Sequence, residues 1–463
     1  MIAAAATAAL AEPKPDAVPV LALAKGALPA WLKKQPPATR RWVETSGFAA
    51  EPGAFCALPG ENGATARILF GYDADDPWCW AQLASKLPEG SYRIERALPP
   101  RQANWAALAW ALSAYRFARY KKSRESVKIA RLCWPAGADR DAVARAARAT
   151  CLVRDLVNMP ASDMGPAELA DAARALARRH KAKTTVVEGD ALLDRSYPAI
   201  HAVGRASSRA PRLIDLVWGS PRAPKVTLVG KGVCFDSGGL DLKPSAGMRL
   251  MKKDMGGAAH ALGLADMIMD AGLKLRLRVL IPAVENAVAG NAMRPLDVIA
   301  TRKGISVEIG NTDAEGRLIL ADCLAEADSE KPDLLIDFAT LTGAARTALG
   351  PELPALFTDD DRLARALLAA GAAESDPLWR LPLWPPYRKL LDSKVAEISS
   401  TGESPFAGAI TAALFLREFV SPATSWAHLD LFAWNASARP GRPEGGEAMT
   451  IRAIYRMLAD RYG

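Results

Sequence analysis

Residues 311–318 read NTDAEGRL and place two carboxylates and a guanidinium close together, at Asp313, Glu315 and Arg317. The alternating residues 304–310 before this octapeptide predict a strand, and the residues after it are apolar at helical spacing. The two acids therefore lie where a strand turns into a helix. Acidic side chains at a helix N-terminus complement the helix dipole, so the octapeptide taken alone has an ordinary structural explanation.

A second charged cluster lies upstream, in residues 229–257, which read VGKGVCFDSGGLDLKPSAGMRLMKKDMGG. The β-branched run Val226–Val229 predicts a buried strand in front of it. Four charged residues of this cluster are candidates for a site: Lys231, Asp236, Lys243 and Asp254. Glycine pairs beside the two aspartates permit tight turns and close approach of the backbone to a ligand. Oxygen donors in such positions suit a divalent cation. Taken alone, each of these charged side chains is more simply explained as a solvated residue of a surface loop.

Several other catalytic arrangements are excluded by their missing motifs. The chain has four histidines, at His180, His201, His260 and His428. None belongs to a His-Glu-x-x-His motif, which excludes a thermolysin-like zinc site, and we expect His260 and His428 to be structural. Lys231 is followed by Gly232, so the segment is not a phosphate-binding P-loop. A Gly-x-Ser-x-Gly elbow is also absent, which argues against a serine hydrolase.

The two clusters together resemble the leucine (cytosol) aminopeptidase family of two-metal peptidases. The resemblance covers roughly residues 151–463 and rests on VGKG, FDSGG, DMGGA and NTDAEGRL, which occur in the family's order. Three further segments extend it: DLVNMP at 155–160, DFATLTGA at 337–344 and WAHLD at 426–430.

We expect an α/β protein of two domains. Residues 1–150 are predicted to form a smaller α/β domain that ends in a linker helix. Residues 151–463 are predicted to form the catalytic domain, a mixed, largely parallel sheet sandwiched by helices, because apolar strands alternate with helical segments from Leu176 onward. Strands are predicted at Ala66–Phe70, Thr184–Val187, Val226–Val229, Arg278–Ile281, Leu334–Phe338 and Trp426–Leu431, and helices at Trp105–Tyr120, Asp141–Leu156, Ala258–Asp270, Leu318–Ala327 and Phe357–Ala373.

The resemblance implies two divalent metal ions in each subunit, Zn²⁺ or Mn²⁺. Asp236 and Glu315 would bridge both ions, Asp313 would complete one site, and Lys231 with Asp254 would complete the other. The lysine must bind as a neutral amine, which two adjacent dications favour by lowering its pKa. The formal charges of the four carboxylates, the two ions, Lys243 and Arg317 add up to a positive total when Lys231 is neutral. The site can therefore accept a hydroxide and one more anion.

The resemblance also implies the reaction of a leucyl-aminopeptidase-type metalloexopeptidase. Such an enzyme is a hydrolase that removes the first residue of peptides with a free N-terminus by means of metal-activated water. Lys243 and Arg317 would be its catalytic residues, the first as a donor to the developing oxyanion and the second as the clamp for bicarbonate, the general base. Substrate contacts would come from Met251, Thr340, Leu341 and Gly343. A homohexamer is the implied assembly.

One segment departs from the family pattern. After WAHLD the family continues with an aliphatic residue and then small ones, whereas here residues 431–435 read LFAWN. Phe432 and Trp434 either narrow the pocket for the first side chain or turn outward into a subunit contact. The preferred N-terminal residue is therefore left open.

The composition of the 463-residue chain sets broad limits. The longest apolar runs are shorter than the ~18 residues that a membrane-spanning helix needs, so we expect no membrane association. The alanine-rich N-terminus has no basic residue before Lys14, which disfavours a signal peptide. Six widely spaced cysteines without a Cys-x-x-Cys pair favour reduced thiols and a cytoplasmic location.

The positive charge is concentrated in the N-terminal part. Residues 1–150 contain 21 Lys and Arg against 13 Asp and Glu, whereas the rest contains 38 of each. The surplus is densest between Arg116 and Arg148. The simpler interpretation of this surplus is a solvated basic face. The alternative is a nucleic-acid-binding role in addition to, or instead of, peptidase activity. No recognised nucleic-acid-binding motif supports that alternative. An inactive scaffold is disfavoured because every ligand and catalytic position of the family pattern is filled.

Overall fold

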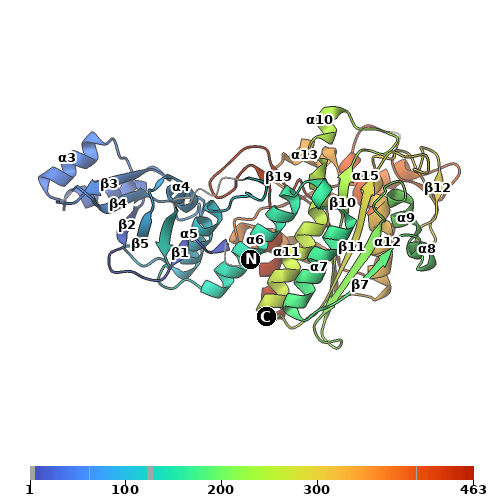
Figure 1. The fold of residues 1–463 in the computed structure, drawn as a ribbon, viewed down its shortest axis with the longest axis horizontal. Helices are drawn as coiled ribbons and strands as arrows, with labels where there is room; N and C mark the ends of the chain where they lie inside the picture. Colours follow the sequence, from blue (N-terminus) through green and yellow to red (C-terminus); the bar gives the residue numbers. More distant parts are fainter. Residues whose placement is uncertain (1–5, 62, 122–128, 403) are drawn as a thin grey trace. The chain divides into compact units, whose positions relative to one another are not determined.

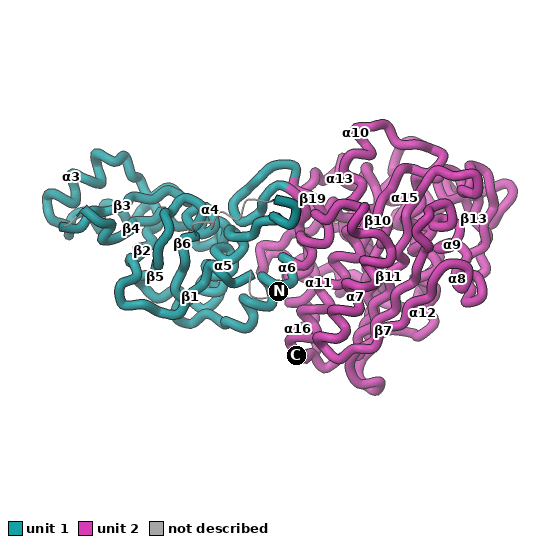
Figure 2. Tube along the Cα trace, in the orientation of Figure 1, with its two compact units in different colours: residues 1–151, 436–444 teal, residues 152–435, 445–463 magenta. Residues whose placement is uncertain are grey.

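The computed structural model describes residues 6–61, 63–121, 129–402 and 404–463, and the chain folds into two compact units (Figure 2). Unit 1 contains Met1–Cys151 together with Ala436–Glu444, and unit 2 contains Leu152–Asn435 with Gly445–Gly463. Helix α6 (Arg140–Asn158) begins in the first unit and ends in the second. Nothing in the sequence indicates that the short segment 436–444 belongs with the N-terminal unit.

Unit 1 is built on a six-stranded sheet in the order β1-β6-β5-β2-β4-β3, parallel except for the antiparallel edge strand β3. Its strands are β1 (Leu10–Ala11), β2 (Val18–Leu23), β3 (Phe55–Pro59), β4 (Thr65–Gly71), β5 (Gly90–Ile94) and β6 (Ala130–Cys133). Its helices are η1 (Lys25–Ala27), α2 (Leu28–Leu32), α3 (Pro37–Thr45), α4 (Cys79–Lys86) and α5 (Pro100–Ser113).

Both faces of this sheet are buried, because successive side chains of a strand point to opposite sides. Val20 packs with Trp80 and Trp110 of α4 and α5 on one face. The next residue, Leu21, packs with Trp31 of α2 on the other. Such a sheet, covered by helices on both faces, is typical of parallel α/β folds.

Unit 2 contains a nine-stranded mixed sheet in the order β16-β15-β18-β14-β9-β11-β8-β7, with β10 paired to β11. Strands β18, β14, β9 and β11 form its parallel centre, and β10 is also parallel to β11. The strands are β7 (Lys183–Glu188), β8 (Arg212–Trp218), β9 (Lys225–Gly230), β10 (Gly232–Asp236), β11 (Arg276–Asn286), β14 (Leu334–Ala339), β15 (Ala355–Phe357), β16 (Trp379–Arg380) and β18 (Trp426–Asp430).

Helices cover both faces of this sheet (Figure 1). On one face lie α7 (Pro166–His180), α11 (Gly256–Ala271), α14 (Asp361–Ala373) and α16 (Ile451–Tyr462), and on the other lie α9 (Pro198–Gly204), α12 (Glu315–Ser329) and α15 (Gly408–Arg417). The remaining elements are short: η2 (Ala161–Asp163), α8 (Ala191–Asp194), α10 (Ser245–Met248), η3 (Met251–Met255), β12 (Val298–Ile299), β13 (Val307–Glu308), α13 (Gly343–Leu349), η4 (Pro385–Leu391), β17 (Ile398–Ser399), β19 (Trp434–Asn435) and β20 (Gly445–Gly446).

The predicted fold class is confirmed: both units are α/β and the larger sheet is mixed and largely parallel. The strand predicted at residues 304–310 is shorter, since only Val307–Glu308 pairs, with β12 and β17. The helix predicted at Trp105–Tyr120 begins earlier and ends at Ser113. All six cysteines are buried thiols. Among the described helices, none has the length and apolar character needed to cross a membrane.

Candidate metal centre and active site

The parallel centre of the larger sheet delivers polar side chains to one edge. Lys231 directly follows β9, Asp236 ends β10, Thr340 follows β14 and Asp430 ends β18. Because the carboxyl ends of neighbouring parallel strands meet at the same edge, these residues converge, as ligand-binding residues of open α/β sheets do. Glu315, the first residue of helix α12, lies at this edge as well, within reach of Lys231.

One half of the site is organised around Lys231. Its Nζ lies 2.8 Å from Asp254 Oδ2 and 2.8 Å from Glu315 Oε1, and it donates to the carbonyl of Thr340 at 3.0 Å. Thr340 Oγ1 donates to Asp254 Oδ1 at 2.7 Å, which fixes the orientation of that carboxylate. All four of these side chains are buried.

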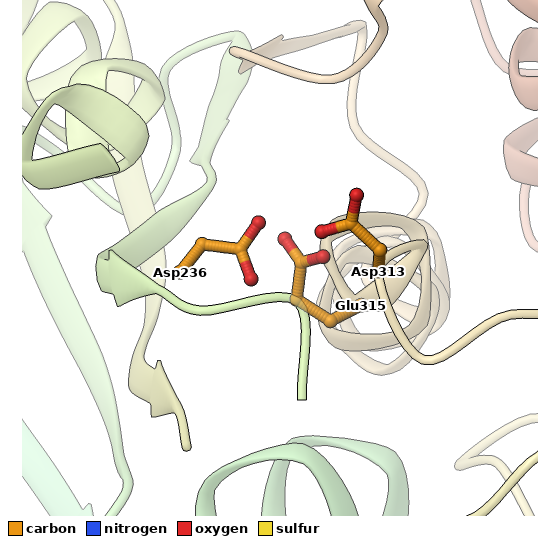
Figure 3. Close-up of side chains that lie close together, drawn as sticks. All are labelled: Asp236, Asp313 and Glu315. Atoms are coloured by element: carbon orange, nitrogen blue, oxygen red, sulfur yellow. The ribbon is translucent and has the colours of Figure 1, made fainter. Parts of the chain in front are cut away.

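The other half is organised around Lys243. Its Nζ lies 2.8 Å from Asp236 Oδ2 and is also paired with Asp313 Oδ1. Figure 3 shows the carboxylates of Asp236, Asp313 and Glu315 turned toward one another, and one oxygen of each lies within 4.8 Å of the others. Three carboxylates at this spacing form a donor set that suits divalent cations.

Two residues without an assigned role in the sequence analysis hold this carboxylate cluster in place. Asn286, at the end of β11, donates to Asp236 Oδ1 at 2.9 Å and to the carbonyl of Thr312 at 3.1 Å. Thr312 Oγ1 in turn donates to the carbonyl of Gly238 at 2.6 Å. These bonds tie the loop after β10 to the loop before α12, so that the acids of the two sequence motifs face each other.

The electrostatics show that the cluster lacks positive charge. Burial, together with Asp236, raises the pKa of Glu315 to about 8 and that of Asp313 to about 6. Although burial opposes it, the surrounding carboxylates raise the pKa of Lys231 and of Lys243 above their ordinary values. Buried carboxylates packed this closely need cations near them, and the two lysine ammoniums supply only part of that charge. The residues therefore fit a site for metal ions.

Arg317 lies in the first turn of α12 and is buried, which lowers the pKa of its guanidinium to about 10. Its Nη1 donates to the carbonyl of Ser400 at 2.6 Å. Its Nε is buried without a hydrogen-bond partner among the described residues. A guanidinium with a free donor beside a cavity suits a planar oxyanion, because its N–H groups form a fixed fork.

A cavity of about 530 Å³ opens over the carboxylate cluster. All of the predicted site residues line it: Lys231, Asp236, Lys243, Met251, Asp254, Asp313, Glu315, Arg317, Thr340, Leu341 and Gly343. Phe432 also lines the cavity. Trp434 does not, and the centroid of its ring lies 5.5 Å from Lys252 Nζ. Of the two aromatic departures from the family pattern, one therefore shapes the pocket and the other does not.

None of the four histidines lines this cavity. His428 pairs with the buried carboxylate of Asp337, which also accepts from Trp426 Nε1 at 2.8 Å. His260 lies inside helix α11, and both of its ring nitrogens are hydrogen-bonded to backbone groups. Both histidines are structural parts of the core.

The basic surplus of the N-terminal unit is partly engaged within the protein. Arg140 is paired with Glu12 at 2.7 Å, and Arg148 is 7% exposed. Part of the densest basic run, residues 122–128, lies outside the described residues. Nucleic-acid binding stays a prediction, and the check is binding to duplex DNA, whose affinity must fall steeply with salt if the basic face is responsible.

Known proteins match this chain over nearly its whole length. Residues 151–455 match the catalytic domain of the cytosol aminopeptidase family, and residues 18–135 match the M17 aminopeptidase N-terminal domain. A probable cytosol aminopeptidase of Roseiflexus castenholzii is 42% identical over 366 residues, which cover 75% of this chain and 74% of that protein.

Solved structures give the same result. The cytosol aminopeptidase from Coxiella burnetii has 51% identity and a TM-score of 0.94, with 98% of this chain and 99% of that chain covered. The bottromycin maturation enzyme BotP in complex with Mn has 36% identity and a TM-score of 0.85, with 96% and 99% covered. Since the family match spans most of the chain and agrees with the carboxylate-rich cavity, this protein belongs to the cytosol aminopeptidase family and is a metal-dependent exopeptidase.

Proposed function

We propose that this enzyme binds two divalent metal ions, Zn²⁺ or Mn²⁺, and removes the first residue from peptides with a free N-terminus. The observation that carries the proposal is the convergence of three carboxylates, Asp236, Asp313 and Glu315, within 4.8 Å at the floor of one cavity. Asp254 and Lys231 lie next to this cluster. The relative that was solved in complex with Mn supports a metal of this class.

The proposed ligands fall into three sets. Asp236 and Glu315 would be shared by both ions, Asp313 would serve one ion, and Asp254 and Lys231 would serve the other. When bound, the ions would polarise the scissile carbonyl and lower the pKa of a coordinated water. In this arrangement Lys231 would bind as the neutral amine, and Lys243 would give up its contacts to Asp236 and Asp313.

Lys243 is then free to serve the reaction. Its side chain is only partly exposed and its Nζ lies at the cavity floor between two carboxylates. An ammonium in this position can donate to the oxygen of the scissile carbonyl as negative charge develops there. Loss of one such donor typically lowers the rate by about 10²–10³-fold.

Arg317 is proposed to hold bicarbonate, which would act as the general base. Its Nε, which has no hydrogen-bond partner among the described residues, and its position in the cavity wall support this role. No described histidine lies in the cavity to take the proton, and the neighbouring carboxylates are assigned as ligands. Backbone groups of Thr340, Leu341 and Gly343 would contact the peptide, and Met251 would form a wall of the pocket for the first side chain.

The wider setting follows the family. We expect a cytoplasmic enzyme, in keeping with the names of its relatives. A homohexamer is also expected, and exposed apolar side chains of unit 2 such as Leu296, Val395 and Phe406 are available for subunit contacts. Sedimentation analysis of the purified protein tests the assembly.

The central experiment combines metal analysis with a panel of aminoacyl amides of Leu, Ala, Arg and Phe. We expect two ions per chain, loss of activity on exhaustive chelation, and recovery with Zn²⁺ or Mn²⁺. Lys243→Ala should lower kcat by about 10²–10³-fold, whereas Lys389→Ala, at an exposed position outside the cavity, should not. Undiminished activity after chelation or in Lys243→Ala would rule out the proposed mechanism.

A further inference from the structure

One wall of the cavity carries two cations, Lys253 and Arg346, that no described side chain neutralises. Lys253 is only 5% exposed, and its Nζ lies 4.9 Å from the ring centroid of Phe432. The guanidinium carbon of Arg346 lies 4.9 Å from the same centroid. All three residues line the cavity. Within the described part of the chain, neither cation forms an ion pair or a side-chain hydrogen bond.

The nearest acids are already engaged. Asp254 contacts Lys231 and accepts from Thr340 Oγ1. Asp430 accepts from the backbone of Leu341 and from both the backbone and the hydroxyl of Thr342. A buried ammonium without a counter-ion costs substantial free energy, and contact with an aromatic face offsets only part of that cost. The donors of Lys253 are thus left for a group that enters the cavity.

The position of Lys253 indicates which part of a substrate would meet it. It belongs to the same short helix, η3, as Met251 and Asp254. Under the proposed function, Asp254 is a metal ligand and Met251 borders the pocket for the first side chain. An anionic group reaching Lys253 and Arg346 is therefore best supplied by the first side chain, and Phe432, which takes the place of a small family residue, holds the two cations at this position.

We propose that Lys253 and Arg346 make this enzyme selective for peptides whose first residue is acidic, glutamate above all. The proposal rests on the proposed aminopeptidase function and specifies its substrate class. The carboxylate of a glutamate side chain, whose oxygens are four bonds from Cα, can accept a hydrogen bond from the Lys253 ammonium and face the Arg346 guanidinium. Both contacts are charge-assisted. The corresponding amide has the same shape but no charge, so it loses most of this interaction.

The test compares kcat/KM for the 7-amido-4-methylcoumarin derivatives of Glu, Gln and Leu with the metal-loaded enzyme. A charge-assisted hydrogen bond predicts a Glu-to-Gln ratio of about 10 to 100. Lys253→Met should lower that ratio by at least about 10-fold and Arg346→Gln, at an exposed position, by less. Lys252→Met is the matched control, because Lys252 carries the same charge one residue earlier but does not line the cavity.

The outcomes separate the two proposals. Cleavage of Leu with a Glu-to-Gln ratio near one in the wild-type enzyme would overturn the acidic selectivity and leave the aminopeptidase function standing. A high Glu-to-Gln ratio that neither Lys253→Met nor Arg346→Gln lowers would also overturn the acidic selectivity. So would a ratio that Lys252→Met lowers as much as Lys253→Met does. Failure to cleave any of the three substrates would remove both proposals.

Discussion

Gly316 leaves the space that the side chain of Lys231 occupies. A Cβ atom on Gly316 would lie 2.6 Å from Lys231 Cε and 2.7 Å from its Nζ. Both distances are far shorter than a van der Waals contact, so a larger residue would displace the amine from Asp254 and Glu315. The glycine that separates acid from base in the octapeptide is thus required by a lysine far away in the sequence.

Gly316→Ala should therefore damage the site through one methyl group. The added atom forces Lys231 or helix α12 to move, and overpacking of this kind costs about 1–3 kcal/mol of stability. Because the moved groups are proposed metal ligands, we expect a larger effect on metal content and kcat than on Tm. Gly290→Ala, where nothing lies within 4 Å of an added Cβ, is the control. Equal activity of the two variants would contradict the close fit.

Glu315→Gln and Asp236→Asn test the two proposed bridging ligands. Each substitution keeps the shape of the side chain and removes one negative charge from the cluster. We expect the metal content to fall below two ions per chain and the activity to fall by at least about 100-fold, as for loss of a major contributor to transition-state stabilisation. Asp171→Asn removes an exposed carboxylate that pairs with a surface arginine, Arg174, and should retain both ions. Full metal content in both bridging variants would exclude the assignment.

The proposed ligands could be predicted from the sequence, whereas the residues that hold them in place by hydrogen bonds could not. Asp236, Asp313 and Glu315 could be predicted, because acids beside glycines at strand and helix ends have a chemical signature. Asn286 and Thr312 could not, since a neutral amide and a hydroxyl carry none, and their importance depends on pairing between distant loops.

The same limit applies to the fold. Helix α14 was predicted from residue 357, but it begins at Asp361 because the side chain of Asp360 caps it, accepting from Arg362 N and Leu363 N. Phe357 instead ends strand β15, whose antiparallel partner β18 lies far along the chain. Local patterns locate such elements, whereas long-range pairing decides where they begin and end.

Arg317→Lys tests the proposed bicarbonate clamp. Lysine keeps the positive charge but loses the fork of N–H donors, including the contact to the Ser400 carbonyl. We expect the wild-type rate to rise with added bicarbonate in carefully degassed buffer and the variant to be about 10²-fold slower and unresponsive, consistent with loss of general-base catalysis. Arg388→Lys, in an ion pair with Glu418 outside the cavity, serves as control. A wild-type rate independent of bicarbonate would leave Arg317 without this function.

His260 provides a pH-dependent term in stability. Its Nδ1 lies 2.6 Å from the carbonyl of Gly256, and its Nε2 accepts from the backbone N–H of Met449 at 2.9 Å. The ring is therefore neutral, with its proton on Nδ1, because Nε2 can accept only when it is unprotonated. Burial lowers its pKa from 6.5 to about 4.

The sign of the effect follows from this lowered pKa. Between pH 6.5 and about 4 the unfolded chain takes up a proton at His260 and the folded chain does not. The free energy of unfolding therefore decreases as the pH is lowered through this window, and His260 does not affect it at higher pH. The full contribution is about 3 kcal/mol, from roughly 1.4 kcal/mol per unit of pKa shift. Urea unfolding at a series of pH values should therefore show a steeper loss for the wild type than for His260→Gln. Ala261→Gly, which weakens the same helix without removing a titrating group, should retain the wild-type slope; identical slopes for wild type and His260→Gln would show that His260 is not the group responsible.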